Sequence, residues 1–157
     1  MGLSPVSGVL YFAYGANMSI GRMTERCPSA HDLGVGVLPE HWLVFSGFSA
    51  GWRGPVANVE PHDGGLVHGR LFELAPSDIV ALDRIEGHPR AYARQIRVAR
   101  SSTLGEVEVH IYVRPRPMPV GEPPREYVRL LLQGYAELGL DPAAVEAAVR
   151  RCAGGAG

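Results

Sequence analysis

The chain of 157 residues is long enough for one domain with a hydrophobic core, and its composition, 46% hydrophobic and 20% charged, is typical of soluble globular proteins. Its 15 basic residues are all arginines and almost balance 16 acidic residues. No basic face of the kind that binds nucleic acid is therefore evident. Scattered arginines such as Arg22 and Arg70 are interpreted as solvated surface residues with local ion pairs. No apolar run approaches the roughly eighteen residues of a membrane span, and the N-terminus lacks the pattern of a secretory signal, so we expect a cytoplasmic protein without nucleic-acid or membrane partners.

The first predicted element is the apolar run 9–14, which is followed by Gly15, by Asn17 and then by a segment of helical character at 19–27. This order predicts a strand, a tight turn and a helix start. Gly15 can adopt backbone angles closed to other residues and lets another molecule approach the main chain closely. Amide N–H groups at the helix start can then donate to a carboxylate or to a developing oxyanion. The alternative is an ordinary strand-to-helix turn with Asn17 or Ser19 as the N-cap.

Further strands are predicted from apolar runs separated by Gly and Pro. They cover residues 33–38, 42–48, 56–60, 66–74, 92–100 and 107–114. Residues 39–41 and 61–65 are expected to be turns, the second of hairpin type. The Pro-rich segment 115–124 is expected to be an extended loop, and whether this loop covers a pocket as a lid is left open.

A helix is predicted over 77–87, with Ser as its N-cap and Gly at its C-terminal end. Glu86 follows Ile79 by seven residues, which at about 3.6 residues per turn places its carboxylate beside the apolar side of the helix. Desolvation there raises the pKa of Glu86 toward the range in which a carboxyl group can both accept and donate a proton. A surface Glu86 paired with Arg84 or Arg90 is the alternative.

Two more helices are predicted, over 125–138 and from Asp141-Pro142 to Cys152, the second with Asp as its N-cap and Pro as its first helical residue. Residues 1–8 and 153–157 are expected to be flexible. Short strands with few helices between them favour a closed or strongly curved sheet flanked by helices. No internal repeat or domain boundary is evident, so residues 1–157 are predicted to form a single domain.

Several classes of chemistry lack support in the sequence. The histidines show no paired metal-ligand spacing and no HExxH motif occurs, so no metal site is predicted. His68, between Val67 and Gly69, is interpreted as a strand residue. Cys27 and Cys152 lie far apart without a CxxC partner and are predicted to be unpaired thiols. The turn at Gly15 and the carboxylate of Glu86 remain as the candidate chemistry.

Four segments, which fit in order and separation along roughly residues 9–150, together resemble the gamma-glutamylcyclotransferase family. They are Tyr11-Phe12-Ala13-Tyr14-Gly15-Ala16-Asn17-Met18, Leu82-Asp83-Arg84-Ile85-Glu86-Gly87 with Tyr92 six residues after the Glu, Pro123-Pro124-Arg125-Glu126-Tyr127, and Gly134-Tyr135-Ala136-Glu137-Leu138-Gly139-Leu140.

This resemblance implies an α+β fold in which a mixed, curved sheet closes into a small barrel flanked by helices. It also implies an enzyme that cyclises a γ-glutamyl group to 5-oxoproline and releases an amine or amino acid, without a cofactor. On this resemblance Glu86 is the general acid/base, and the remaining site residues bind the small-molecule γ-glutamyl substrate: Tyr14, Gly15, Ala16, Asn17, Tyr92 and Tyr127.

The chain departs from its relatives at Ala16, where many family members have Ser. The turn also resembles neither the YGTL-like turn of the γ-glutamylamine cyclotransferases nor the GYGS-type turn of the glutathione-specific group. A γ-glutamyl amino acid or a γ-glutamylated metabolite is therefore the expected substrate. A non-catalytic binding module of the same fold is the alternative, which Ala16 favours and Glu86 disfavours. The leaving group and the oligomeric state, a homodimer included, are left open.

Overall fold

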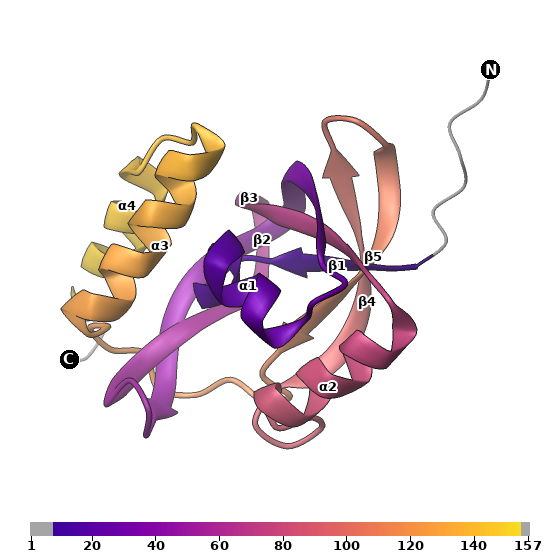
Figure 1. Cartoon of the computed structure of the whole chain (residues 1–157). Coiled ribbons are helices and arrows are strands. Elements are labelled where there is room, and N and C mark those ends of the chain that lie inside the picture. Colours follow the sequence, from indigo (N-terminus) through magenta and orange to yellow (C-terminus); the bar gives the residue numbers. More distant parts are fainter. Residues whose placement is uncertain (1–7, 155–157) are drawn as a thin grey trace.

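The computed structural model describes residues 8–154, so the segments 1–7 and 155–157 of the predicted flexible ends lie outside the described residues. The elements follow one another as β1 (Val9–Ala13), a 3-10 helix η1 (Ala16–Met18), α1 (Ile20–Arg26), β2 (His31–Ser49), β3 (Gly54–Leu74), α2 (Pro76–Glu86), β4 (Ala93–Ser101), β5 (Gly105–Val113), α3 (Arg125–Leu138) and α4 (Ala143–Gly154). Figure 1 shows them in this order along the colour bar.

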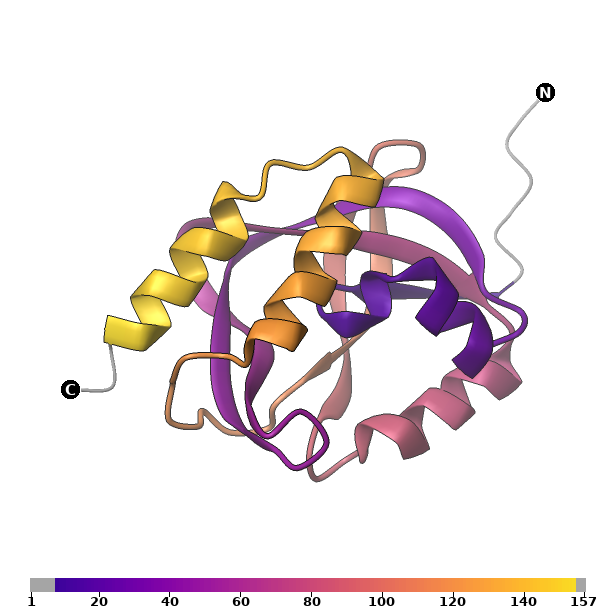
Figure 2. The ribbon, with the colours of Figure 1, turned by 60° about the vertical axis from the view of Figure 1, so that its left-hand side comes forward.

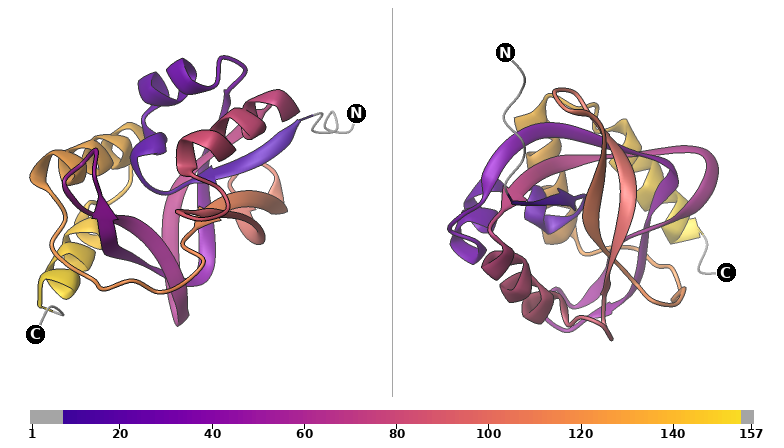
Figure 3. Two further views of the ribbon diagram at one scale, coloured as in Figure 1. Left: turned by 90° about the horizontal axis from the view of Figure 1, so that it is seen from below. Right: turned by 90° about the vertical axis from the view of Figure 1, so that its right-hand side faces the viewer.

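The sheet closes into a barrel with the strand order β1-β3-β2-β4-β5. Most neighbouring strands are antiparallel, but β1 runs parallel to β5, with Tyr11 opposite His110. The barrel is therefore mixed, and the predicted α+β fold of a small barrel flanked by helices is confirmed. The right-hand view of Figure 3 shows the strands curving around the barrel.

The predicted turns at 39–41 and 61–65 are wrong, because β2 and β3 each run through them as one long strand. The two segments face each other: Pro39 pairs with Leu66 and His41 with Pro61, so one residue of β2 opposes four residues of β3. The ladder is irregular at this point, with a bulge of several extra residues in β3, and Glu40 opposite them has a φ of 61°. Gly and Pro mark bulges as well as turns, which explains the misassignment.

The helix predictions are closer to the structure. Helix α3 has the predicted bounds, and α2 ends as predicted, with Gly87 in the left-handed conformation. However, α2 begins at Pro76, so the predicted N-cap at Ser77 is wrong. Helix α4 begins at Ala143, one residue later than predicted, so Pro142 lies just before it. Asp141 Oδ1 still accepts a hydrogen bond from the N–H of Ala143 at 2.9 Å, at the start of the helix. Helix α4 continues through residues 153–154, which were expected to belong to a flexible tail.

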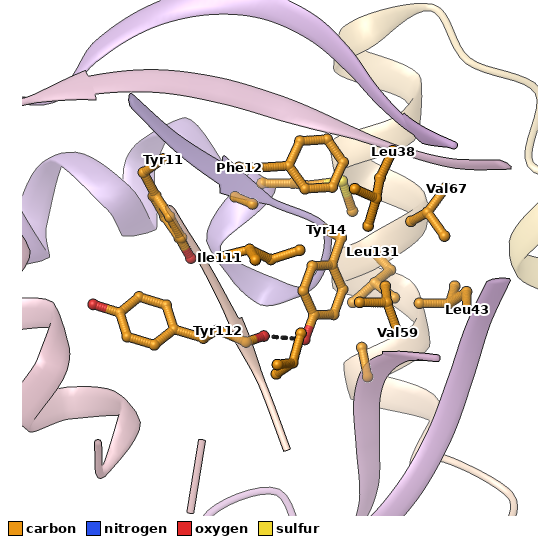
Figure 4. Packing of buried hydrophobic residues seen from close by; sticks show 14 of the residues in the cluster. Tyr11, Phe12, Tyr14, Leu38, Leu43, Val59, Val67, Ile111, Tyr112 and Leu131 are labelled. Atoms are coloured by element: carbon orange, nitrogen blue, oxygen red, sulfur yellow. Dashed lines mark hydrogen bonds between the residues drawn. The ribbon is translucent and has the colours of Figure 1, made fainter. Parts of the chain in front are cut away.

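The helices lie in two groups outside the barrel. Helix α4 packs on β2, and α3 lies beside α4 and contacts η1 (Figures 1 and 2). On another side α1 contacts α2, and the left-hand view of Figure 3 shows these two helices next to each other. Inside the barrel the side chains pack as in Figure 4, with Phe12 fully buried and the Tyr14 hydroxyl donating to the carbonyl of Tyr112 at 2.5 Å.

Arg70 is not the solvated arginine that the sequence suggested, since it is 2% exposed. Its Nε donates to the carbonyl of Met18 at 2.8 Å, and its terminal nitrogens form ion pairs with Asp32 at 2.8 Å and Glu137 at 3.0 Å. One side chain of β3 thereby connects η1, β2 and α3. The hydrogen bond from Arg70 to Met18 therefore helps to fix the turn before α1.

Candidate active site

A pocket of about 450 Å³ lies where the turn after β1, helix α1, the end of α2 and the loop between β2 and β3 meet. All seven predicted site residues line it, although they come from distant parts of the chain: Tyr14, Gly15, Ala16, Asn17, Glu86, Tyr92 and Tyr127. Residues 115–124 do not line it, and their loop is instead bonded to β2, where the N–H of Gly47 donates to Pro119 at 3.0 Å.

Glu86 is the last residue of α2, directly before the left-handed Gly87, and its carboxylate faces the turn. Its Oε1 accepts a hydrogen bond from Asn17 Nδ2 at 3.2 Å. The same amide nitrogen donates to the Tyr11 hydroxyl at 3.0 Å. Among the described residues no ion pair joins Glu86 to Arg84 or Arg90, so the surface-pair alternative is not what forms.

Burial raises the pKa of Glu86 above its ordinary value. The guanidinium of Arg26, the hydrogen bond from Asn17 and the guanidinium of Arg22 act in the opposite direction and lower it in part. The result is a half-buried carboxyl group whose protonated and ionised forms are closer in free energy than in water. Such a group is suited to accepting and then donating a proton.

The turn is built so that its side chains leave the backbone accessible. Ser19, one of the two expected N-caps, caps α1 by accepting from the N–H of Arg22 at 3.3 Å, which leaves the amide of Asn17 for Glu86. A Cβ atom at Gly15 would lie 2.9 Å from the Tyr127 hydroxyl, so glycine is what allows this close approach. Within η1 the N–H of Met18 donates to the carbonyl of Gly15 at 3.0 Å, and a hydrogen bond from the backbone of Ala16 to the Tyr127 hydroxyl lowers the pKa of that phenol in part.

Two predicted tyrosines meet the backbone of one residue of β3. The Tyr92 hydroxyl donates to the carbonyl of Ala57 at 2.7 Å, and the N–H of Ala57 donates to the Tyr127 hydroxyl at 3.0 Å. Burial raises the pKa of Tyr92 to about 12 and that of Tyr127 further above its ordinary value. Both phenols therefore stay neutral near pH 7 and can act as hydrogen-bond donors or acceptors, but not as bases.

Several pocket residues were missed by the sequence analysis, among them Tyr11, Arg22, Arg26, Trp52 and Arg114. Arg22 and Arg26 were assigned to the solvated surface, but they lie four residues apart on the helix that follows the turn, and this spacing puts them on one face. The spacing was a usable signal. Trp52 and Arg114 come from a glycine-rich loop and a strand end, and their positions depend on the barrel closing.

Among residues 8–154 no group of three His, Cys, Asp or Glu side chains could hold a metal ion. Both cysteines are unpaired, as predicted, and both are buried. His68 lies within β3, also as predicted. In the same described range, no helix has the length and apolar character needed to cross a membrane.

Comparison with known proteins decides the family. A family model described as gamma-glutamyl cyclotransferase, AIG2-like, matches residues 11–134. The chain belongs to this family. It is 30% identical to the gamma-glutamylcyclotransferases of Mus musculus and Homo sapiens, over 83% of this chain and 72% of each relative. A solved structure named gamma-glutamyl cyclotransferase superposes with a TM-score of 0.81 at 26% identity, covering 89% of this chain and 85% of that one.

As a family member, the chain is an enzyme of the gamma-glutamylcyclotransferase type. The matched span 11–134 contains all seven predicted site residues and every other residue that lines the pocket. The pocket therefore belongs to the part of the chain that the family shares.

Proposed function

We propose that the chain cyclises a γ-glutamyl group to 5-oxoproline and releases the amine or amino acid that was joined to it, with Glu86 as the general acid/base. The observation that carries this proposal is the position of the Glu86 carboxylate. It is half-buried, its pKa is raised, and it faces the glycine turn across a single side-chain amide, that of Asn17.

The proposed reaction needs no nucleophile from the protein. The α-amine of the substrate attacks its own γ-carbonyl carbon, a C–N bond of the five-membered ring forms, and the C–N bond to the leaving group breaks. The α-ammonium group loses two protons as it becomes the ring N–H; Glu86 takes them in turn and passes them to the leaving nitrogen, which departs as an ammonium group. Holding the chain of the substrate folded supplies proximity, which can lower the barrier by up to roughly 7–11 kcal/mol.

The turn supports the charge that develops in this reaction. Backbone N–H groups at Gly15 and Ala16 would donate either to the γ-carbonyl oxygen as it becomes negative or to the α-carboxylate of the substrate. These donors belong to the main chain, so the Ala side chain at position 16 removes none of them. Tyr127 accepts from the N–H of Ala57, which leaves its own hydroxyl proton for an acceptor in the pocket.

The test is 5-oxoproline release from γ-glutamyl amino acids, γ-glutamyl amines and glutathione, with the wild type and Glu86→Gln side by side. We expect kcat to fall by about 10²–10⁴-fold in Glu86→Gln, the range typical of a lost general acid/base. Glu108→Gln is the matched control, because Glu108 is exposed on β5 outside the pocket, and it should retain wild-type rates. Equal activity of wild type and folded Glu86→Gln would contradict the assigned role. No release from any substrate by the wild type would contradict the reaction.

A further inference from the structure

Arg22 has a hydrogen-bond donor inside the pocket that lacks an acceptor. Its Nε is buried, and among residues 8–154 this is the buried side-chain nitrogen or oxygen for which no hydrogen-bond partner is present. A buried N–H of a charged group without an acceptor costs free energy, and native proteins rarely leave one unpaired. An acceptor that arrives with the substrate would remove this cost.

Trp52 holds the guanidinium group in place. The Cζ atom of Arg22 lies 5.6 Å from the centre of the Trp52 ring, and that ring meets Tyr127 edge to face at 5.1 Å. Arg22 therefore spans from α1 to the loop between β2 and β3. A guanidinium placed over an aromatic face keeps its in-plane N–H groups free, and these match the two oxygens of a carboxylate.

The other groups of the pocket leave this role to Arg22. Arg114 also lines the pocket, but its Nη2 donates to the carbonyl of Ser46 at 2.8 Å and its guanidinium lies 4.8 Å from the ring centre of Tyr92. The residues that line the pocket include one carboxylate, Glu86, and three arginines. This excess of positive charge suits a substrate that brings a carboxylate of its own.

Phe48, four residues before Trp52 in the chain, also lines the pocket and is 69% exposed, so the pocket is open to solvent at this segment. On the proposed function the reacting bond lies beside Glu86 and the turn at Gly15. A substrate placed with its γ-amide at Glu86 would extend its leaving group past Trp52.

We propose that Arg22, held by Trp52, forms a subsite for the carboxylate of the released amino acid. This inference rests on the proposed function, and it assigns the leaving group: amino acids or short peptides whose carboxylate lies near the scissile amide are selected over amines that lack one. Arg26, on the same face of α1, adds to the positive charge of the subsite.

The test uses two substrates that differ in this carboxylate alone, γ-glutamyl-alanine and γ-glutamyl-ethylamine. The readout is the ratio of their kcat/KM values, because any change in the Glu86 pKa affects both substrates alike. We expect the wild type to prefer γ-glutamyl-alanine by about ten- to a hundredfold, the range expected for hydrogen bonds to a charged group. In Arg22→Gln the ratio should fall toward one, and Arg22→Lys should keep part of it. Arg129→Gln, at an exposed arginine of α3, is the matched control and should keep the wild-type ratio.

Binding of the same two compounds to Glu86→Gln, measured by calorimetry, separates this inference from the proposed function. The subsite is supported if γ-glutamyl-alanine binds more tightly than γ-glutamyl-ethylamine and if adding Arg22→Gln to Glu86→Gln abolishes this difference. That result supports the subsite even if the wild type releases no 5-oxoproline. A wild-type ratio near one, an equal loss for both substrates in Arg22→Gln, or no binding of either compound would overturn it.

Discussion

Substitutions at Gly15 and Tyr127 should be energetically coupled, because a side chain added at position 15 would meet the Tyr127 hydroxyl. A Cβ atom built on Gly15 lies 2.9 Å from the Tyr127 hydroxyl and 3.5 Å from the Cβ of Ala57, so the hydroxyl alone is too close. The Tyr127 ring is 4% exposed and packs edge to face against Phe45 and Trp52. It cannot swing away, and in Gly15→Ala we expect the hydroxyl to lose its hydrogen bond from the N–H of Ala57.

An unpaired buried N–H costs about 1–3 kcal/mol, and a Gly-to-Ala change returns about 0.4–1 kcal/mol by restricting the unfolded chain. Gly15→Ala should therefore lower the free energy of unfolding by about 1–2 kcal/mol. Tyr127→Phe leaves the same N–H unpaired and should cost a similar amount. In the double variant the contact is absent and the N–H is already unpaired, so Gly15→Ala should return about 0.4–1 kcal/mol and cost nothing further.

Urea denaturation of the wild type, the two single variants and the double variant measures this coupling, with circular dichroism as the probe. Additive losses, within about 0.5 kcal/mol, would show that the hydroxyl does not limit what can stand at position 15. A stable Gly15→Ala with an unchanged KM for a γ-glutamyl substrate would further contradict the idea that close approach to the backbone of this turn matters.

Three further predictions concern stability and positioning. Because burial raises the pKa of Glu86 in the folded protein, the stability that this group contributes is present below its pKa in the unfolded chain and is lost as the pH rises through its pKa in the folded protein. Glu86→Gln should therefore be more stable than the wild type at about pH 8. Urea denaturation should show this difference in stability shrinking toward about pH 4. Arg70→Met should lower the free energy of unfolding by about 3 kcal/mol, since it breaks the two ion pairs of a buried arginine, with the part-exposed Asp32 and Glu137. Arg129→Met, at an exposed position, should change it by less than about 0.5 kcal/mol. Tyr112→Phe removes the 2.7 Å hydrogen bond to Asp83 on α2, so steady-state kinetics should show a lower kcat with KM little changed, and an equal change in both would contradict a positioning role.

The parts of the fold that follow local rules could be predicted from the sequence. Helix α3 has the predicted bounds because Pro124 precedes it and Gly139, with a φ of 71°, ends it. Local patterns also predicted the turn at Gly15 and a closed or strongly curved sheet, and the family resemblance implied that the sheet forms a barrel. The helix ends and the turn depend on residues close together in the chain, where Gly and Pro decide the backbone angles.

What could not be predicted depends on contacts between distant residues. The bulge at Glu40 has the composition of a turn, and only its partner strand, with Pro61 opposite His41, distinguishes the two. Arg22 likewise has a helix position that the sequence shows, but the surface it faces is decided by a loop thirty residues later in the chain, where Trp52 lies. Burial of a charged side chain is a property of the neighbours, and the neighbours come from the closed barrel.

Tyr112 links the two halves of the site to each other. Its hydroxyl donates to Asp83, one turn before Glu86 on α2, and Arg94 of β4 holds the same carboxylate at 2.8 Å. Its carbonyl accepts from the hydroxyl of Tyr14, the residue before the glycine of the turn. The acid that we propose as catalyst and the backbone that we propose as binding turn are thus attached to one residue of β5, inside a barrel wall. Because that wall is a closed ladder, the distance between the two halves is set by strand geometry and not by a flexible loop. A cyclisation that depends on holding a short substrate folded has use for such a rigid separation.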